Sequence, residues 1–202
     1  MNIILLTDSD FTSATHCTLQ GERALHIVNI LKSTVGDTLR VGVLNGNMGS
    51  AQIVAISGTG SSTQIQLHLI QLDQTPSTPL PITLLLALPR PRMLGRLLRD
   101  VTSLGIKHIH LFGSNKVENS YWQTPALKPD SVHEKLLEGL AQARDTHLPT
   151  VHLHRHFREV SDTLLPALLQ THIGVVADPF SPRATPTLPA QKPVALLIGP
   201  EG

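Results

Sequence analysis

The 202-residue sequence contains little cysteine, few aromatic residues and no long apolar run. Its single cysteine, Cys17, excludes a disulfide framework, which fits a reducing compartment. No segment approaches the roughly 18 apolar residues that a membrane helix needs, and the N-terminus lacks the basic start of a signal peptide. We therefore expect a soluble cytoplasmic protein with no membrane partner. Because aromatic residues make up only 3%, leucine, isoleucine and valine must form the core.

An excess of charge of either sign is also absent. Lysine and arginine total 16, aspartate and glutamate total 15, and the formal net charge is +1. The overall charge therefore gives no indication of a nucleic-acid partner. A site for RNA would have to depend on where the arginines cluster along the chain.

A proline-rich stretch at 74–81 separates two halves with different patterns, and we interpret it as a linker. The first half, 1–73, combines one helix at 21–32 with a hairpin turn at Asn45-Gly46. Short strands are predicted at four places in it: 2–7, 38–44, 50–57 and 63–72. Short strands at such close spacing predict a small β-barrel.

In the second half, 82–202, apolar strands alternate with helices. The predicted strands are 82–88, 107–112, 150–154, 173–177 and 194–198, and the predicted helices are 92–104, 131–144 and 160–170. This alternation predicts an α/β domain whose parallel sheet is covered on both faces. Ligands of such domains bind at the carboxyl ends of the strands.

Two loops are expected to meet at that edge. The strand ending at Ile198 leads directly into Gly199-Pro200-Glu201-Gly202, where glycine lets a ligand approach the backbone and proline stiffens the turn. Asp178-Pro179-Phe180 follows the preceding strand. Each loop could be an ordinary turn, but two loops at one edge favour a pocket.

Arginines on the helix at 92–104 are candidates for RNA contacts. Arg92, Arg96 and Arg99 share one face at spacings of four and three, and Arg90 extends the group into the preceding loop. Three arginines on one face favour contacts to phosphate, although a solvated helix face is the alternative. Arg144, at the end of another helix, is in a position that the helix dipole favours for a cation.

A row of histidines, His152, His154 and His156, lies on or next to the strand at 150–154. Side chains at this spacing point to the same side of a strand, which raises the alternative of a metal-dependent enzyme. Three ligands on one strand are too collinear to surround an ion easily. We therefore expect no metal and interpret the row as a solvent-facing or interface surface.

Three parts of the sequence together resemble the RsmE family of the SPOUT class of knotted methyltransferases. The first is the strand and turn Leu196–Gly202, and the second combines Ala87-Leu88-Pro89, Met93 and Val101–Gly105. The third lies in the first half and comprises Ala24–Leu31, Val35-Gly36-Asp37 and Asn45-Gly46. Two stretches depart from the family pattern: Ala141–Arg144 lacks an acidic residue and has its arginine displaced, and Arg90-Pro91-Arg92 replaces a lysine-rich loop.

The resemblance implies a PUA-like RNA-binding barrel followed by a SPOUT domain that forms a trefoil knot. It implies methylation of uridine N3 in 16S ribosomal RNA with S-adenosylmethionine, by a homodimer. Arg92 and Arg144 would be catalytic, and Arg90, Arg96 and Arg99 would contact RNA. The residues that would bind the cofactor are Asp178, Pro179, Leu197, Ile198, Gly199, Pro200, Glu201 and Gly202.

Because the family continues beyond this motif, we expect a sequence truncated at its C-terminus, inside the cofactor site. The alternative on the same fold is a non-catalytic RNA-binding or ribosome-assembly protein.

Overall fold

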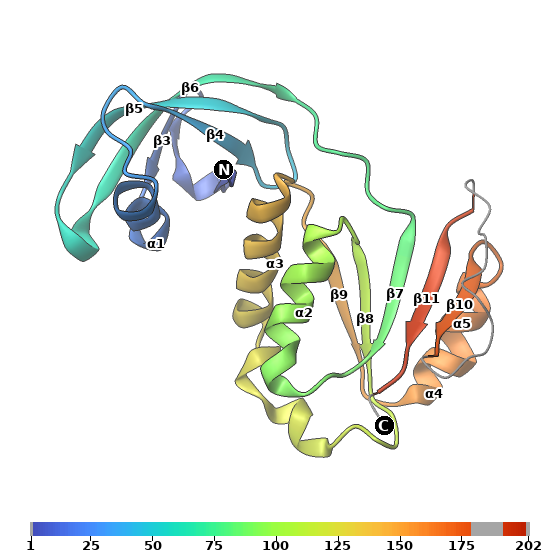
Figure 1. The fold of residues 1–202 in the computed structure, drawn as a ribbon. Coiled ribbons are helices and arrows are strands. Elements are labelled where there is room, and N and C mark those ends of the chain that lie inside the picture. The colour runs from blue at the N-terminus through green and yellow to red at the C-terminus, as the bar shows by residue number, and fades with distance from the viewer. Residues whose placement is uncertain (1, 179–191, 201–202) are drawn as a thin grey trace. The chain divides into compact units, whose positions relative to one another are not determined.

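A computed structural model describes residues 2–178 and 192–200, which belong to two compact units. The first unit comprises the chain up to Ser77 together with Leu140–Leu148. The second comprises Thr78–Gly139 and the chain from Pro149 onward. Figure 1 labels the larger helices and strands of both units. The return of Leu140–Leu148 to the first unit was not expected from the sequence.

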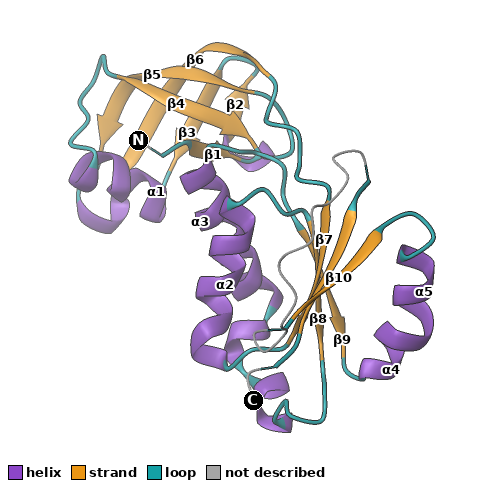
Figure 2. Cartoon of the chain, turned by 45° about the vertical axis from the view of Figure 1, so that its right-hand side comes forward, coloured by secondary structure: helices purple, strands orange, loops and turns teal. Residues whose placement is uncertain are grey.

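Six strands form one mixed sheet in the first unit, in the order β1-β4-β5-β6-β3-β2 (Figure 2). They are β1 (Ile4–Leu6), β2 (Phe11–Ser13), β3 (His16–Leu19), β4 (Thr38–Val43), β5 (Met48–Ser57) and β6 (Gln64–Gln74). Only β1 and β4 pair in parallel. The strands β1 and β2 remain at opposite edges, so the pairing of the described residues gives an open half-barrel. The closed barrel expected from the sequence is not confirmed, because two edge strands of three residues offer few groups with which to pair.

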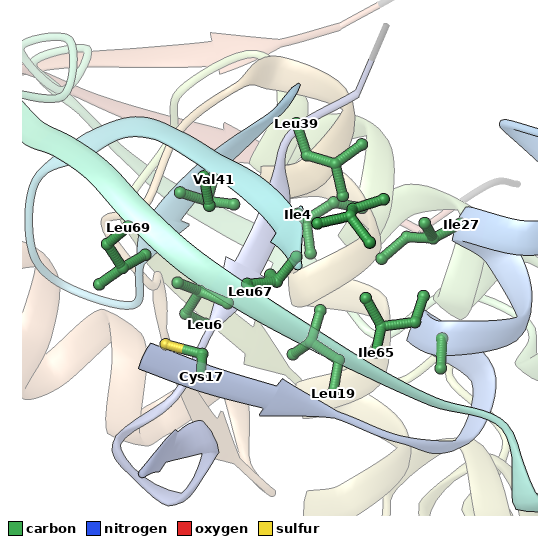
Figure 3. Close-up of a cluster of buried hydrophobic side chains, with 13 residues drawn as sticks. Ile4, Leu6, Cys17, Leu19, Ile27, Leu39, Val41, Ile65, Leu67 and Leu69 are labelled. Atoms are coloured by element: carbon green, nitrogen blue, oxygen red, sulfur yellow. The ribbon is translucent and has the colours of Figure 1, made fainter. Parts of the chain in front are cut away.

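The core of this unit lies between the sheet and a short helix. The predicted helix at 21–32 is present as α1 (Gly21–Leu25), which continues as the π-helical turn η2 (His26–Ile30). Ala24 and Ile27 are fully buried against the strands. Figure 3 shows this aliphatic cluster, whose buried members are Ile4, Leu6, Cys17, Leu19, Ala24, Ile27, Leu39, Val41, Ala51, Ile53, Ile65, Leu67 and Leu69. Cys17 is thus a core residue, and its burial raises the pKa of the thiol to about 11.

A buried ion pair ties the start of the chain to α1. Asp10 ends the turn η1 (Asp8–Asp10) and is only 5% exposed. Both of its carboxylate oxygens accept hydrogen bonds from the Arg23 guanidinium, at 2.6 Å each. The Thr7 backbone N–H donates to the same carboxylate at 2.7 Å. Burial raises the pKa of Asp10, but the bonds from Arg23 and Thr7 outweigh it and hold the pKa below its usual value.

The second unit contains a five-stranded, fully parallel sheet in the order β10-β11-β7-β8-β9. Its strands are β7 (Ile82–Ala87), β8 (His108–Phe112), β9 (Thr150–His154), β10 (Ile173–Ala177) and β11 (Val194–Ile198). Its helical segments are α2 (Pro91–Ser103), η4 (Asn119–Gln123), η5 (Pro125–Leu127), α3 (Pro129–Ala143), α4 (Phe157–Glu159), η6 (Val160–Leu164) and α5 (Leu165–Leu168). The predicted parallel α/β fold is therefore confirmed, and all five predicted strands are present.

Helices cover the two faces of this sheet. Figure 2 shows α2 on one face and α4 with α5 on the other. Leu94 and Leu98 of α2 are buried, whereas Val160 of η6 packs with Leu85 and Ala87 of β7. No helix in the part of the chain that is described has the length and apolarity needed to cross a membrane.

The direction in which strands are added reverses beside β7. The chain proceeds from β7 to β8 and β9 on one side, and then crosses to β10 and β11 on the other. The carboxyl ends of β7 and β11 consequently lie side by side, with Ile198 in register with Leu86. Such a reversal leaves a crevice at the carboxyl edge of a parallel sheet, where ligands bind.

Candidate functional site

A cavity of about 330 Å³ lies at this reversal, in the second unit. Its walls come from the end of β7, the first turns of α2, the loop after β8 and the end of β11. The lining residues are Leu86, Ala87, Leu88, Pro89, Arg90, Met93, Leu97, Lys116, Val117, Glu118, Tyr121, Ile198, Gly199 and Pro200. We call it the switch-point cavity. Its volume falls within the range of about 300–1,000 Å³ that is usual for small-molecule sites.

The β7 wall is fixed by backbone hydrogen bonds. Leu88 N–H donates to the Phe112 carbonyl at 2.8 Å, which extends the pairing of β7 with β8 beyond the strand. Pro91 then occupies the first turn of α2, where a missing N–H costs nothing and a fixed φ favours the helix. Arg90 is the residue that precedes this turn, and it is exposed at the rim of the cavity.

The loop after β8 is held close to the strand β9. Gly113 N–H donates to the His154 carbonyl at 2.9 Å. A Cβ at position 113 would lie 2.2 Å from the Arg155 carbonyl oxygen, so only glycine permits this approach. The Arg155 guanidinium also lies over the Trp122 ring, 6.0 Å from its centre. These contacts place Lys116 and Tyr121 at the cavity.

Three residues of that loop were missed in the sequence. Lys116, Glu118 and Tyr121 belong to no motif and lie in a stretch without periodicity. A cation and an aromatic residue shortly after a predicted strand would have been the available signal. In the structure, Glu118 is engaged locally: its carboxylate accepts hydrogen bonds from Ser120 Oγ at 3.2 Å and Tyr121 Oη at 3.3 Å.

The end of β11 leaves space beside its backbone. A Cβ on Gly199 would meet no atom within 4 Å, and the residue is exposed. A ligand can therefore approach the backbone of Ile198, Gly199 and Pro200. Asp178 follows the last residue of β10, Ala177, which is in register with Ile198, so it leaves the sheet at the same edge.

The other expected cofactor-binding residues separate into three groups. Ile198, Gly199 and Pro200 line the switch-point cavity. Leu197 packs on the opposite face of the sheet, beside the cluster of Leu85 and Val160. The predicted residues Pro179, Glu201 and Gly202 lie outside the described residues.

The predicted arginines also have different surroundings. Arg90 lines the cavity, whereas Arg92 is exposed on the first turn of α2 and is not part of the lining. Arg96 lies 3.5 Å from the Asp100 carboxylate. Arg99 lies 3.4 Å from Asp100 and 4.0 Å from Glu138 of α3, so the expected cationic face is partly neutralised.

Arg144 belongs to the first unit. It follows α3 with a φ of 57°, the left-handed region that usually favours glycine. There it lines a groove of about 330 Å³ together with Arg40, Gln71 and Gln74. The structure thus does not place the two expected catalytic arginines, Arg92 and Arg144, in the lining of one cavity.

The expected histidine row is only partly present. His152 and His154 lie on β9, but His156 follows the strand and precedes α4. Their neighbour is His110 of β8, which stacks on His152 at 4.8 Å and whose Nδ1 lies 2.9 Å from His154 Nε2. Among the described residues, no group of three or more histidine, cysteine or acidic side chains has a geometry that could hold a metal ion.

This cluster predicts acid sensitivity. Burial, followed by the charges of His152, His154 and His108, lowers the pKa of His110 to about 4. The unfolded chain therefore takes up the proton at a higher pH than the folded protein does. We expect the free energy of unfolding to fall by about 2 kcal/mol between pH 7 and pH 4, with most of the loss below pH 6.5.

Urea denaturation across this pH range measures the effect. His110→Phe keeps a stacked ring that does not titrate and should flatten the dependence, whereas His133→Gln, at an exposed position on α3, should not change it. A slope that is the same in His110→Phe as in the unchanged protein would contradict the assignment.

Comparisons with known proteins agree with this architecture. A family model described as an RNA methyltransferase domain matches residues 76–202. The ribosomal RNA small subunit methyltransferase E of Treponema pallidum (strain Nichols) is 33% identical over 156 residues, which cover 75% of this chain and 56% of that protein. The ribosomal RNA small subunit methyltransferase E 1 of Borreliella burgdorferi is 24% identical over 159 residues, or 79% of this chain and 64% of that protein. The chain thus spans less than two thirds of the length of either relative.

Among solved structures, the ribosomal RNA small subunit methyltransferase E of Neisseria gonorrhoeae, bound to S-adenosyl methionine, superposes with a TM-score of 0.68. The match covers 98% of this chain and 80% of that one at 14% identity, which supports the fold. The family match over 76–202, the related sequences and the strand-to-turn element at Leu196–Pro200 lead to one conclusion. The chain belongs to the RNA methyltransferase domain family, and the ribosomal RNA small subunit methyltransferases named above are among its relatives.

Proposed function

We propose that the protein transfers a methyl group from S-adenosylmethionine to N3 of a uridine in 16S ribosomal RNA. One observation supports this most strongly: the family's strand-to-turn element ends at the reversal of the sheet, beside a cavity of about 330 Å³. The fold alone would not specify the activity, because one fold serves many functions. The position of the cavity at the carboxyl edge, together with the family match, favours an enzyme over a passive scaffold.

The residues at the end of β11 fit the methyl donor. S-adenosylmethionine, when bound, supplies an electrophilic methyl group on a sulfonium sulfur. The open space beside Gly199 would admit it against the backbone, and Ile198 and Pro200 would flank it. Asp178, at the same edge, is a carboxylate that could accept hydrogen bonds from its ribose hydroxyls. Pro179, Glu201 and Gly202 complete the set that we propose for this role.

The chain then has to orient the target base and stabilise charge. Uridine N3 carries a weakly acidic proton, which must leave before the nitrogen lone pair can attack the methyl carbon. Preorganised cations that face the resulting anion lower the barrier to this step. Arg92, exposed beside the cavity-lining Arg90, remains our proposal for such a contact, and Arg144 of the first unit is retained as a proposed catalytic residue.

The first unit is proposed to bind RNA. We infer that residues 1–73 form a PUA-like domain that grips the ribosomal RNA by shape and backbone, while residues 82–202 form the SPOUT domain. Arg96 and Arg99 would contribute contacts to phosphate in competition with Asp100 and Glu138. We further propose that the protein acts as a cytoplasmic homodimer.

Deletion of the gene tests the proposed activity. Ribosomal RNA of the small subunit from the deletion strain should lack one methylated uridine, and the gene on a plasmid should restore it. Mass spectrometry of nuclease fragments measures both. An unchanged set of modifications would exclude the proposed reaction and favour the non-catalytic assembly role.

A further inference from the structure

The charges around the switch-point cavity are not balanced. Arg90 and Lys116, on loops that follow neighbouring strands, both line it, and within the described residues neither forms an ion pair. The carboxylate in the lining, Glu118, accepts hydrogen bonds from Ser120 and Tyr121. Arg96 and Arg99, by contrast, lie within 4.0 Å of acidic side chains. The positive charges at the rim of the cavity are therefore more available to bind an anion than those of Arg96 and Arg99 on α2.

Lys116 lies between the switch-point cavity and a second cavity. It lines this second cavity, of about 420 Å³, together with Ser114, Asn115, Phe157 and Pro200. Lys116 and Pro200 are thus common to both cavities. The Ser114 hydroxyl in the second cavity is buried and has no hydrogen-bond partner in the described structure. An exposed lysine between two cavities can reach a ligand that enters from either.

The rest of the lining suits an unstacked nucleobase. Half of the fourteen lining residues are apolar chain residues that provide broad, uncharged walls: Leu86, Ala87, Leu88, Met93, Leu97, Val117 and Ile198. Tyr121 adds an aromatic ring on which a base can stack, a contact worth about 1–3 kcal/mol per base in other nucleic-acid-binding proteins. An apolar pocket with one aromatic wall and cations at its rim has the composition of a nucleotide site.

The cavity also lies on one side of the proposed cofactor strand. Its walls come from the end of β7, the first turns of α2, the loop after β8 and the end of β11, whereas Asp178 follows β10, which pairs with the opposite edge of β11. The turn Ile198–Pro200 therefore borders both regions. A base in the cavity and a methyl donor on the Asp178 side would therefore both contact this turn.

We propose that the switch-point cavity is the seat of the target uridine, with Tyr121 stacking on the base and Lys116 contacting a carbonyl oxygen of the uracil. This inference rests on the proposed function and names the substrate side of the same site. Loss of the N3 proton to solvent places negative charge on the two carbonyl oxygens. The N3 lone pair then forms the bond to the methyl carbon, and the electrons of the broken carbon–sulfur bond remain on sulfur. Lys116 lowers the energy of the anion and is itself unchanged.

Lys116→Met tests the role of the charge. At neutral pH and saturating substrates, the turnover rate should fall by about 100-fold, the scale observed when one group that stabilises a developing anion is removed. The deficit should narrow as the pH rises, because more uridine loses its N3 proton without help. Lys116→Arg should recover most of the rate. Lys128→Met, at an exposed lysine outside the cavity lining, is the matched control and should leave rate and pH profile unchanged.

Two readouts do not depend on turnover. Calorimetry should give the same affinity for S-adenosylmethionine in Lys116→Met as in the unchanged protein, within about twofold. RNA that carries 4-thiouridine in place of uridine should cross-link to the loop of residues 116–121 under ultraviolet light, as mapped by mass spectrometry of peptides. Cytidine in place of the target uridine should remove this cross-link.

The outcomes separate the inference from the proposed function. If the full-length protein transfers no methyl group to ribosomal RNA, the proposed function fails, and the cross-link still decides where uridine binds. If it is active but Lys116→Met has an unchanged rate, or a deficit that does not vary with pH, Lys116 does not stabilise the anion. Cross-links confined to other parts of the chain would overturn the assignment of the cavity.

Discussion

Replacement of Gly199 by valine is expected to weaken binding of S-adenosylmethionine by at least about 100-fold, or about 2.7 kcal/mol. The proposed cofactor lies against the backbone at the end of β11, where the absence of a side chain leaves the space open. Valine would fill that space and separate the ligand from the backbone groups that it contacts. Titration calorimetry on the full-length protein measures the loss directly.

The fold itself should tolerate this change. A Cβ at position 199 meets no atom within 4 Å, and the residue does not adopt a left-handed conformation. The melting temperature should therefore remain within a few degrees of that of the unchanged protein. Gly95→Ala, on α2, is a matched glycine control, since the nearest side-chain atoms to its Cβ would be Lys135 methylene groups at 3.5–3.6 Å, an ordinary contact distance. Unchanged cofactor affinity in Gly199→Val would show that the donor binds elsewhere.

The parallel sheet was predictable because its signals are local. The strands β7, β10 and β11 are short, largely apolar runs, whereas β8 and β9 alternate histidine or threonine with apolar residues, and α2 has a clear helical period. The half-barrel was less predictable, because β2 and β3 are only three and four residues long, too short for a pattern to stand out, and both were missed. Whether edge strands meet to close a barrel depends on pairing between distant segments, which periodicity does not encode.

The return of Leu140–Leu148 to the first unit has a similar explanation. Thr146 Oγ1 donates to the Gly46 carbonyl, and Leu148 N–H donates to Asn45 Oδ1 at 2.9 Å. The hairpin turn at Asn45-Gly46 was evident from the dipeptide alone. The segment that bonds to it lies about a hundred residues away and carries no matching pattern.

The site shows the same division. The turn at Gly199-Pro200 could be inferred because it directly follows an apolar strand, and the structure places it beside a cavity. The place of Lys116 and Tyr121 in the site could not be inferred, because only the tertiary fold brings their loop, which has no sequence pattern, to that edge. The spacing of Arg96 and Arg99 was interpreted correctly as one face, but Glu138 approaches from another helix. Charge on a helix face can be judged only when the neighbouring elements are known.

Replacement of Arg23 by methionine is expected to lower the free energy of unfolding by about 2–4 kcal/mol. A buried carboxylate that loses its partner costs about 3–5 kcal/mol, and the lower range applies because the Arg23 side chain is 39% exposed to water. Asp10 would keep the Thr7 N–H bond but lose both hydrogen bonds from the guanidinium, and the Leu5 carbonyl would lose the one that Arg23 donates at 2.9 Å. Urea denaturation at pH 7 measures the change.

The pH dependence of the free energy of unfolding shows whether the charge of Asp10 causes this loss. In the unchanged protein the pKa of Asp10 is lowered, so its contribution to stability is present above its usual value of 3.8 and is lost only in stronger acid. Without Arg23, burial is opposed by fewer bonds, the pKa rises, and protonation should relieve part of the cost at a higher pH. Asp10→Asn combined with Arg23→Met should recover much of the stability, because no buried charge remains. Arg158→Met, at an exposed arginine of α4, is the control for loss of a surface charge. A change below about 1 kcal/mol in Arg23→Met would place the pair among surface ion pairs and would show that Asp10 is reached by water.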